Sequence, residues 1–166
     1  MADIELYSWS GGFADLISED RRSVAQLVKD GGAIVGSIEQ VTNRLDRTQM
    51  LALLHDQATD RIVGVAVLKT PGQGYRADKF AIAGVPITGF EAAPELGYVV
   101  VAEDMRGRQL SGCLVDAIVK GLRVPVFATT DSSTMKNNLT GSGFTRVGQE
   151  WQGQKATLSL WTFTPR

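Results

Sequence analysis

A short apolar stretch followed at once by an amphipathic stretch constrains the fold of this chain most. Residues 95–101, ELGYVVV, are rich in β-favouring side chains and predict a strand. Residues 110–122 place apolar side chains at the i, i+3, i+4, i+7 spacing of an amphipathic helix. Because residues 102–109 are the only connection, this segment predicts a strand that leads through a short loop into a helix packed on the same sheet.

Flanking patterns give the fold class. The runs 50–54 and 62–68 are apolar and separated by a polar HDQATDR segment, which predicts an antiparallel hairpin. Further strands are expected at 4–9, 125–130, 144–151 and 156–163, and helices over 13–29 and after Ser132. Residues 32–44 are ambiguous, and residues 71–89 predict a loop or long excursion beside the sheet. This order predicts a mixed α+β fold in one domain, residues 1–166.

Composition and charge exclude several functional classes. The chain of 166 residues has a net charge of -1, unlike proteins that grip nucleic acid through phosphates. No segment approaches the roughly 20 apolar residues of a membrane span. One histidine and one cysteine cannot build the usual metal sites or an intrachain disulfide. Asp3 and Glu5 oppose a signal peptide, so we expect a cytoplasmic protein without metal, membrane or nucleic-acid partner.

Two arginines around a glycine lie where the predicted strand 95–101 passes into the helix. A helix N-terminus exposes unpaired N–H groups and a partial positive charge, which together favour phosphate. Arg106 and Arg108 add charge, and Gly107 allows tight backbone geometry. The alternative is a solvated basic turn that feeds an amphipathic helix. Spacing alone leaves both interpretations open.

Three segments resemble the GNAT superfamily of acyl-CoA-dependent N-acyltransferases. GYVVVAEDMRGRQLSGCLVDAIV resembles the strand, Arg/Gln-x-x-Gly-x-Gly/Ala loop and helix that bind acyl-CoA in that family. VFATTDSSTMKNNLTGSGFTRVGQEW resembles its later strand, short helix and Gly-Phe pair, here Gly143–Phe144. The hairpin 51–69 resembles its central hairpin. The resemblance implies a mostly antiparallel central sheet flanked by helices, with a splayed strand pair at the CoA site.

Three positions depart from the family pattern. Gln109 stands where the first glycine of Gly-x-Gly would let the backbone approach the pyrophosphate, and Ser111 stands where glycine or alanine is usual. Leu139 occupies the position four residues before the Gly-Phe pair, where many members carry a tyrosine that protonates the leaving thiolate. A leucine cannot donate that proton, which leaves Ser132–Thr134 or water as donors.

The resemblance implies roles for further residues. Backbone groups of Val99 and Val101 would pair with the pantetheine arm of acetyl-CoA. The pyrophosphate would be held by Arg106, Gly107, Arg108, Gln109, Leu110 and Ser111. Glu95 is the candidate general base, and strict alternation along the strand predicts that it shares a face with Val99 and Val101. The alternative is a surface glutamate at the start of the strand.

We therefore expect transfer of an acetyl or other short acyl group from acyl-CoA to a small-molecule or peptide amine. Two alternatives remain: a non-catalytic GNAT-like acyl-CoA sensor or interaction module, and a general α+β domain without a CoA site. Members of the family often form homodimers, which the resemblance implies as an option here. His55 is expected to be structural or to line a substrate pocket, and Cys113 lies on the apolar stripe and is expected in the core.

Overall fold

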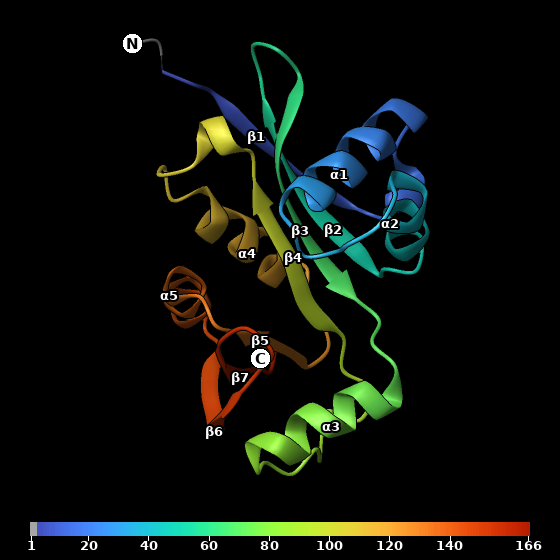
Figure 1. Cartoon of the computed structure of the whole chain (residues 1–166). Helices are drawn as coiled ribbons and strands as arrows, with labels where there is room; N and C mark the ends of the chain where they lie inside the picture. The colour runs from blue at the N-terminus through green and yellow to red at the C-terminus, as the bar shows by residue number, and fades with distance from the viewer. Residues whose placement is uncertain (1–2) are drawn as a thin grey trace.

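A computed structural model describes residues 3–166, which form a seven-stranded sheet flanked by helices (Figure 1). The strand order is β1-β2-β3-β4-β5-β7-β6. Neighbouring strands are antiparallel except β4 and β5, which are parallel. The strands are β1 (Leu6–Gly11), β2 (Met50–Asp56), β3 (Arg61–Lys69), β4 (Glu95–Val101), β5 (Val126–Thr130), β6 (Thr145–Gln152) and β7 (Thr157–Phe163).

Helices cover both faces of the sheet. They are α1 (Ser18–Asp30), α2 (Ile38–Leu45), α3 (Gln73–Ala83), α4 (Leu110–Lys120) and α5 (Ser133–Gly141), with single-turn η1 (Phe13–Asp15) and η2 (Glu103–Met105). A hydrophobic core lies on each face of the sheet at β3, and alternate residues of this strand point into one or the other. Val65 and Val67 pack with α1 and α2, whereas Ala66 and Leu68 pack with α4. The helix α3 packs against β5, β7 and β6. It lies on the face that α1 and α2 cover, because its neighbour Phe127 is paired with Glu95 and Glu95 with Lys69.

The strands β4 and β5 meet at one end and diverge. Within residues 3–166 their pairing is restricted to Glu95 with Phe127, and the backbone N–H of Phe127 donates to the Pro94 carbonyl at 3.2 Å. Beyond that point the edge of β4 that faces β5 has no strand partner in the described chain. Unpaired strand edges present free N–H and C=O groups, so the divergence leaves hydrogen-bonding groups in the middle of the sheet.

A β-bulge interrupts β4 at the same place. Val65 pairs with Val100 and Val67 pairs with Gly97, so β4 has one residue more than β3 between these two pairs. Tyr98 lies in the bulge with φ of 47°, a conformation that is uncommon for a residue other than glycine. The extra residue shifts the alternation of β4, so residues before and after Tyr98 do not keep a common face.

The segment 71–89, predicted as a loop or excursion, contains the helix α3. Gly72 and Gly74 weaken the helical pattern, which explains why the sequence did not indicate it. Arg76 is buried, and its guanidinium donates to the carbonyls of Ala93 and Glu91, both at 2.8 Å. These bonds tie α3 to the segment that enters β4, so an arginine that reads as a surface residue helps to set the position of Glu95.

The ambiguous segment 32–44 resolves into a loop and then α2, which begins after Ser37. The Ser37 hydroxyl accepts from the Gln40 N–H, and the Gln40 side chain accepts from the Ser37 N–H, forming a capping box. The predicted strands and the helices at 110 and 133 are confirmed within a few residues. Within residues 3–166, no helix has the length and apolar content needed to cross a bilayer.

Candidate functional site

A groove of about 460 Å³ opens where β4 and β5 diverge, on the face covered by α4 and α5. We call it the cradle groove. Val99 and Val101 form its β4 wall, Ser132 and Met135 its α5 wall, and the start of α4 its end. Of the eight positions predicted to bind acyl-CoA, seven line the groove: Val99, Val101, Arg106, Gly107, Gln109, Leu110 and Ser111.

The N-terminus of α4 opens into this groove in a left-handed turn. Gln109 is the N-cap residue with φ of 60° and ψ of 25°, and Gly107 has φ of 81°. The Gln109 side chain makes no capping hydrogen bond. Within residues 3–166, no hydrogen bond is donated by the backbone N–H groups of residues 107–111. Free N–H groups at a helix N-terminus suit a phosphate, so the loop fits a pyrophosphate group.

The two arginines of the loop are placed differently. Arg106 lines the groove, and its Nε donates to the Val101 carbonyl at 3.2 Å, which holds the guanidinium beside β4. Arg108 is exposed and is not among the lining residues. Its positive charge instead helps to lower the pKa of Asp104, after the larger effect of the Arg61 hydrogen bond. In this conformation only Arg106 supplies a cation to the groove wall.

Ser111 links the cradle groove to the neighbouring cleft between α4 and α5. Its Oγ accepts a hydrogen bond of 2.8 Å from Asn138 Nδ2, so the hydroxyl proton remains available to another acceptor. Gln109, Ser111 and Thr134 line both the groove and this cleft, which has a volume of about 510 Å³. The site is therefore elongated, as a nucleotide attached to a long arm requires. Cys113 also lines the cleft and is exposed, so its predicted core position is wrong.

A separate pocket of about 330 Å³ lies on the opposite face of β4. We call it the arginine pocket. It is lined by Arg44, Arg47, Lys69, Thr70, Pro71, Gly72, Tyr75, Glu95 and Tyr98. These residues come from the end of α2, the link between β3 and α3, the first turn of α3, and β4. The pocket thus lies between the α1/α2 and α3 parts of the same face.

Glu95 is the buried acidic group of the arginine pocket, with 2% of its surface exposed. Its Oε1 forms an ion pair with Lys69 Nζ, and the same Nζ lies 4.5 Å from the centroid of the Tyr98 ring. Its Oε2 has no hydrogen-bond partner among residues 3–166. A buried carboxylate oxygen without a partner is costly, and it is available to accept a hydrogen bond or a proton.

The predicted common face of Glu95, Val99 and Val101 is wrong. Lys69 pairs with Glu95 and Gly64 pairs with Val101, and residues 64 and 69 point to opposite faces of β3. The bulge at Tyr98 causes this change, and it also brings Tyr98 onto the Glu95 side, where the sequence pattern did not place it. The candidate base and the predicted pantetheine contacts therefore meet only through the gap between β4 and β5.

Tyr75 is a residue of this site that the sequence did not indicate. Burial raises the pKa of its phenol well above the ordinary value of 10.0, and the negative charge of Glu95 raises it further. Tyr75 lines the arginine pocket with 43% of its surface exposed, and burial is the largest cause of the raised pKa. Thr129 of β5 acts in the opposite direction and lowers this pKa, by less than burial and Glu95 raise it.

Leu139, at the position of the family's tyrosine, and His55, expected to be structural or to line a substrate pocket, are not among the lining residues of the cradle groove or of the arginine pocket. Leu139 is fully buried among the core residues between α4, α5 and the sheet, so its side chain points away from the groove. His55 is buried and stacks on Tyr7 with ring centroids 4.6 Å apart, and its Nδ1 lies 3.6 Å from an Asp60 oxygen. Ser132 and Thr134 line the cradle groove, so their hydroxyls remain candidate proton donors.

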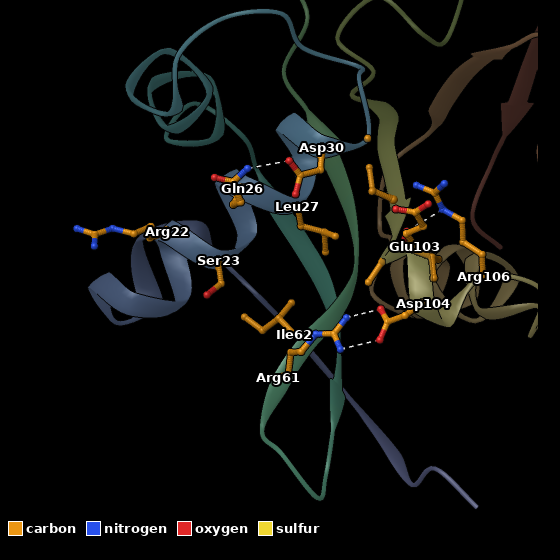
Figure 2. Close-up of a pocket in the computed structure, with 14 residues that line it drawn as sticks. Arg22, Ser23, Gln26, Leu27, Asp30, Arg61, Ile62, Glu103, Asp104 and Arg106 are labelled. Carbon is orange, nitrogen blue, oxygen red and sulfur yellow. Dashed lines mark hydrogen bonds and ion pairs between the residues drawn. The ribbon is translucent and has the colours of Figure 1, made fainter. Parts of the chain in front are cut away.

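A larger cleft of about 820 Å³ lies between α1 and the segment after β4 (Figure 2). Arg61 and Asp104 face each other across it in a two-point ion pair, in which Arg61 Nη1 donates to Asp104 Oδ2 at 2.8 Å. On its α1 side, Gln26 Nε2 donates to Asp30 at 2.7 Å. The Arg61–Asp104 pair ties the start of β3 to the segment that leads into the 106–111 loop, whereas the Gln26–Asp30 bond lies within α1.

Comparison with known proteins identifies the fold. No family model matches the sequence, and no curated protein matches it. Solved structures match over nearly the whole chain. A GNAT-family acetyltransferase from Streptococcus agalactiae is 8% identical with a TM-score of 0.69, covering 99% of each chain. An acyl-CoA N-acyltransferase from Pseudomonas aeruginosa is 13% identical with a TM-score of 0.65, covering 95% of this chain and 99% of that one.

Arabidopsis thaliana NAA60, solved in complex with acetyl-CoA, is 13% identical with a TM-score of 0.66, covering 97% of this chain and 100% of that one. The chain therefore has the fold of the GNAT acetyltransferases, and the predicted fold class is confirmed.

Proposed function

We propose that this chain, which has the GNAT fold, transfers an acetyl or other short acyl group from acyl-CoA to an amine. The proposal rests on the cradle groove. Free N–H groups and Arg106 lie at its α4 end, and the edge of β4 that has no strand partner within residues 3–166 lies along its length. The similarity in fold to solved acyltransferase structures, which share little sequence identity with this chain, supports this function.

Each wall of the site has a proposed part in the reaction. The N–H groups of residues 107–111 and the Arg106 guanidinium hold the pyrophosphate. Backbone groups of Val99 and Val101 orient the pantetheine arm, although the Val101 carbonyl already accepts from Arg106. Bound acyl-CoA supplies the activated acyl group as a thioester. The amine enters from the arginine pocket and reaches the gap between β4 and β5 from the opposite face.

Glu95 is the proposed general base. An amine is protonated near neutral pH and must lose a proton before its nitrogen can attack the thioester carbonyl. Glu95 Oε2 is buried and has no hydrogen-bond partner among residues 3–166, so it accepts that proton directly or through water. Lys69 holds the other oxygen and fixes the carboxylate in place. The departing thiolate takes a proton from water or from the Ser132 or Thr134 hydroxyl.

The first experiment titrates acetyl-CoA and follows the melting temperature. Ligand at 100 times Kd stabilises by about 2.7 kcal/mol, which raises Tm by about 8 °C for a domain of this size. Ser111→Glu places a negative charge at the cradle without harming a helix N-terminus. Ser111→Gln is the matched neutral control and loses the same Asn138 bond. We expect the shift to vanish in Ser111→Glu and persist in Ser111→Gln. No shift in the wild type at millimolar acetyl-CoA would contradict the proposal.

The second experiment separates catalysis from binding. Glu95→Gln keeps the size of the side chain and removes its basic oxygen. We expect acyl transfer to amines, measured as release of free CoA thiol, to fall at least about 100-fold, while the acetyl-CoA shift in Tm stays. Full turnover in Glu95→Gln would exclude Glu95 as the base.

A non-catalytic acyl-CoA sensor is the second candidate. The burial of Leu139 in the core favours it, because the leucine at the position of the family's tyrosine donates no proton to a leaving thiolate. A sensor shows the same acetyl-CoA shift in Tm, lost in Ser111→Glu and kept in Ser111→Gln. It releases no CoA thiol with any amine. The two experiments therefore distinguish the enzyme from the sensor.

A further inference from the structure

The arginine pocket carries more positive charge than Glu95 neutralises. Its lining holds three cationic side chains and one carboxylate. Lys69 is engaged, because its ammonium group is paired with Glu95 and lies over the Tyr98 ring. Arg44 and Arg47 form no ion pair or side-chain hydrogen bond within residues 3–166, although both line the pocket. Two guanidinium groups therefore remain to bind a ligand.

Helix electrostatics explain only one of the two arginines. Arg44 lies in the last turn of α2, where a cation interacts favourably with the helix dipole. Arg47 lies beyond the end of α2, and the next acidic group on the pocket wall is the buried Glu95, already paired with Lys69. A planar guanidinium binds carboxylates and phosphates in a two-point geometry. The pocket thus has an anion-binding wall and, at its buried side, an oxygen that accepts from a cation.

We propose that the acceptor is an amine that also carries an anionic group, a carboxylate or a phosphate. Arg44 and Arg47 bind the anionic group, and the amine points toward Glu95 Oε2 and the β4–β5 gap. The pocket volume of about 330 Å³ suits an amino acid or an aminoalkyl phosphate. This inference rests on the proposed function, in which the arginine pocket receives the acceptor, and it excludes polycationic amines as preferred substrates because two arginines repel them.

The test measures binding of matched probes to the whole chain in the presence of CoA. Alanine, methionine and phenylalanine are each compared with their carboxamides, and phosphoethanolamine is compared with ethanolamine. Each pair keeps the amine and differs in the anionic group. We expect at least one anionic probe to bind at least about fivefold more tightly than its neutral partner. Preference in the amino-acid pairs identifies a carboxylate, and preference in the ethanolamine pair identifies a phosphate.

The variant is Arg44→Gln with Arg47→Gln, and the matched control is Arg146→Gln. Arg146 lies on the edge strand β6, paired with Glu150 at 3.2 Å, and its loss changes the net charge in the same direction. In the double variant the anionic probe and its neutral partner should bind with about equal affinity, whereas the control should keep the preference for the anionic probe. Equal binding of acid and amide in the wild type, an unchanged preference in the double variant, or no binding of any probe at about 10 mM would each overturn the inference.

The acetyl-CoA titration is run on the same samples and keeps the two proposals distinct. If acetyl-CoA raises Tm but anionic and neutral probes bind alike, the acceptor inference fails and the acyl-CoA site stands. If the anion preference is found without any acetyl-CoA shift, the acyltransferase proposal fails and the pocket remains an anion site.

Discussion

Replacing Gln109 by glycine should make the protein more stable and its cradle more open. Gln109 adopts φ of 60°, and a residue with a Cβ atom is destabilised there by about 1–2 kcal/mol relative to glycine. Glycine also increases the conformational entropy of the unfolded chain, which lowers this gain in folding free energy by about 0.5–1 kcal/mol. The Gln109 side chain makes no capping bond, so nothing else is lost from the helix end. We expect a net gain of about 0.7 kcal/mol and a rise in Tm of about 2 °C.

Gln109→Ala is the matched control, because it removes the same side chain but keeps the Cβ atom. The alanine variant should gain no stability, since the left-handed conformation still strains its backbone. Thermal and urea unfolding of the three proteins measure the difference. A loss of stability in Gln109→Gly, or an equal gain in Gln109→Ala, would refute the reasoning that backbone strain at this residue is stored in the folded state.

Acetyl-CoA affinity of the same variants reports on the side chain itself. Gln109 lines both the cradle groove and the adjoining cleft, so its removal lets the phosphate approach the free N–H groups. We expect Kd to fall about fivefold in Gln109→Gly. Weaker binding in both variants would mean that the glutamine amide contributes hydrogen bonds to the ligand, contrary to this expectation.

Three further changes test the surroundings of the site. Lys69→Met leaves the Glu95 carboxylate buried without its partner, so the free energy of unfolding in urea should fall by about 3 kcal/mol. A free energy of unfolding equal to that of the wild type would mean that the pair is not buried in solution. Leu139→Tyr overfills a fully buried position, so it should destabilise by about 1–3 kcal/mol without faster thiol release, and higher turnover would show that this residue can reach the groove. Above pH 10 the unfolded chain loses the Tyr75 proton first, because the folded pKa is raised, so stability falls as pH rises toward the folded pKa. Tyr75→Phe should flatten that alkaline slope in thermal unfolding, and an unchanged slope would contradict the burial of this hydroxyl.

The sequence determined those parts of the protein that depend on local periodicity. The strand 95–101 and the helix from Leu110 are found at the residues where their patterns begin, because one is a run of β-favouring residues and the other carries an apolar stripe at helical spacing. Residue types and spacing alone left the loop between them open between a phosphate cradle and a solvated basic turn. The resemblance to the GNAT superfamily favoured the cradle, and most of the loop's residues line a groove. The left-handed conformation of Gln109 was indicated only by the glycine that the GNAT family has at this position.

Tertiary structure decided how the two sides of the site are related. The bulge at Tyr98 is set by the register of β4 against β3, and no local pattern reveals a register. It moves Glu95 to the face opposite Val99 and places it beside Lys69, a residue of another strand. The helix α3 and the two arginines at and just beyond the end of α2 line one pocket with Glu95 only because the chain folds them over one face of the sheet. Residues far apart in the chain become a pocket through packing, which periodicity does not encode.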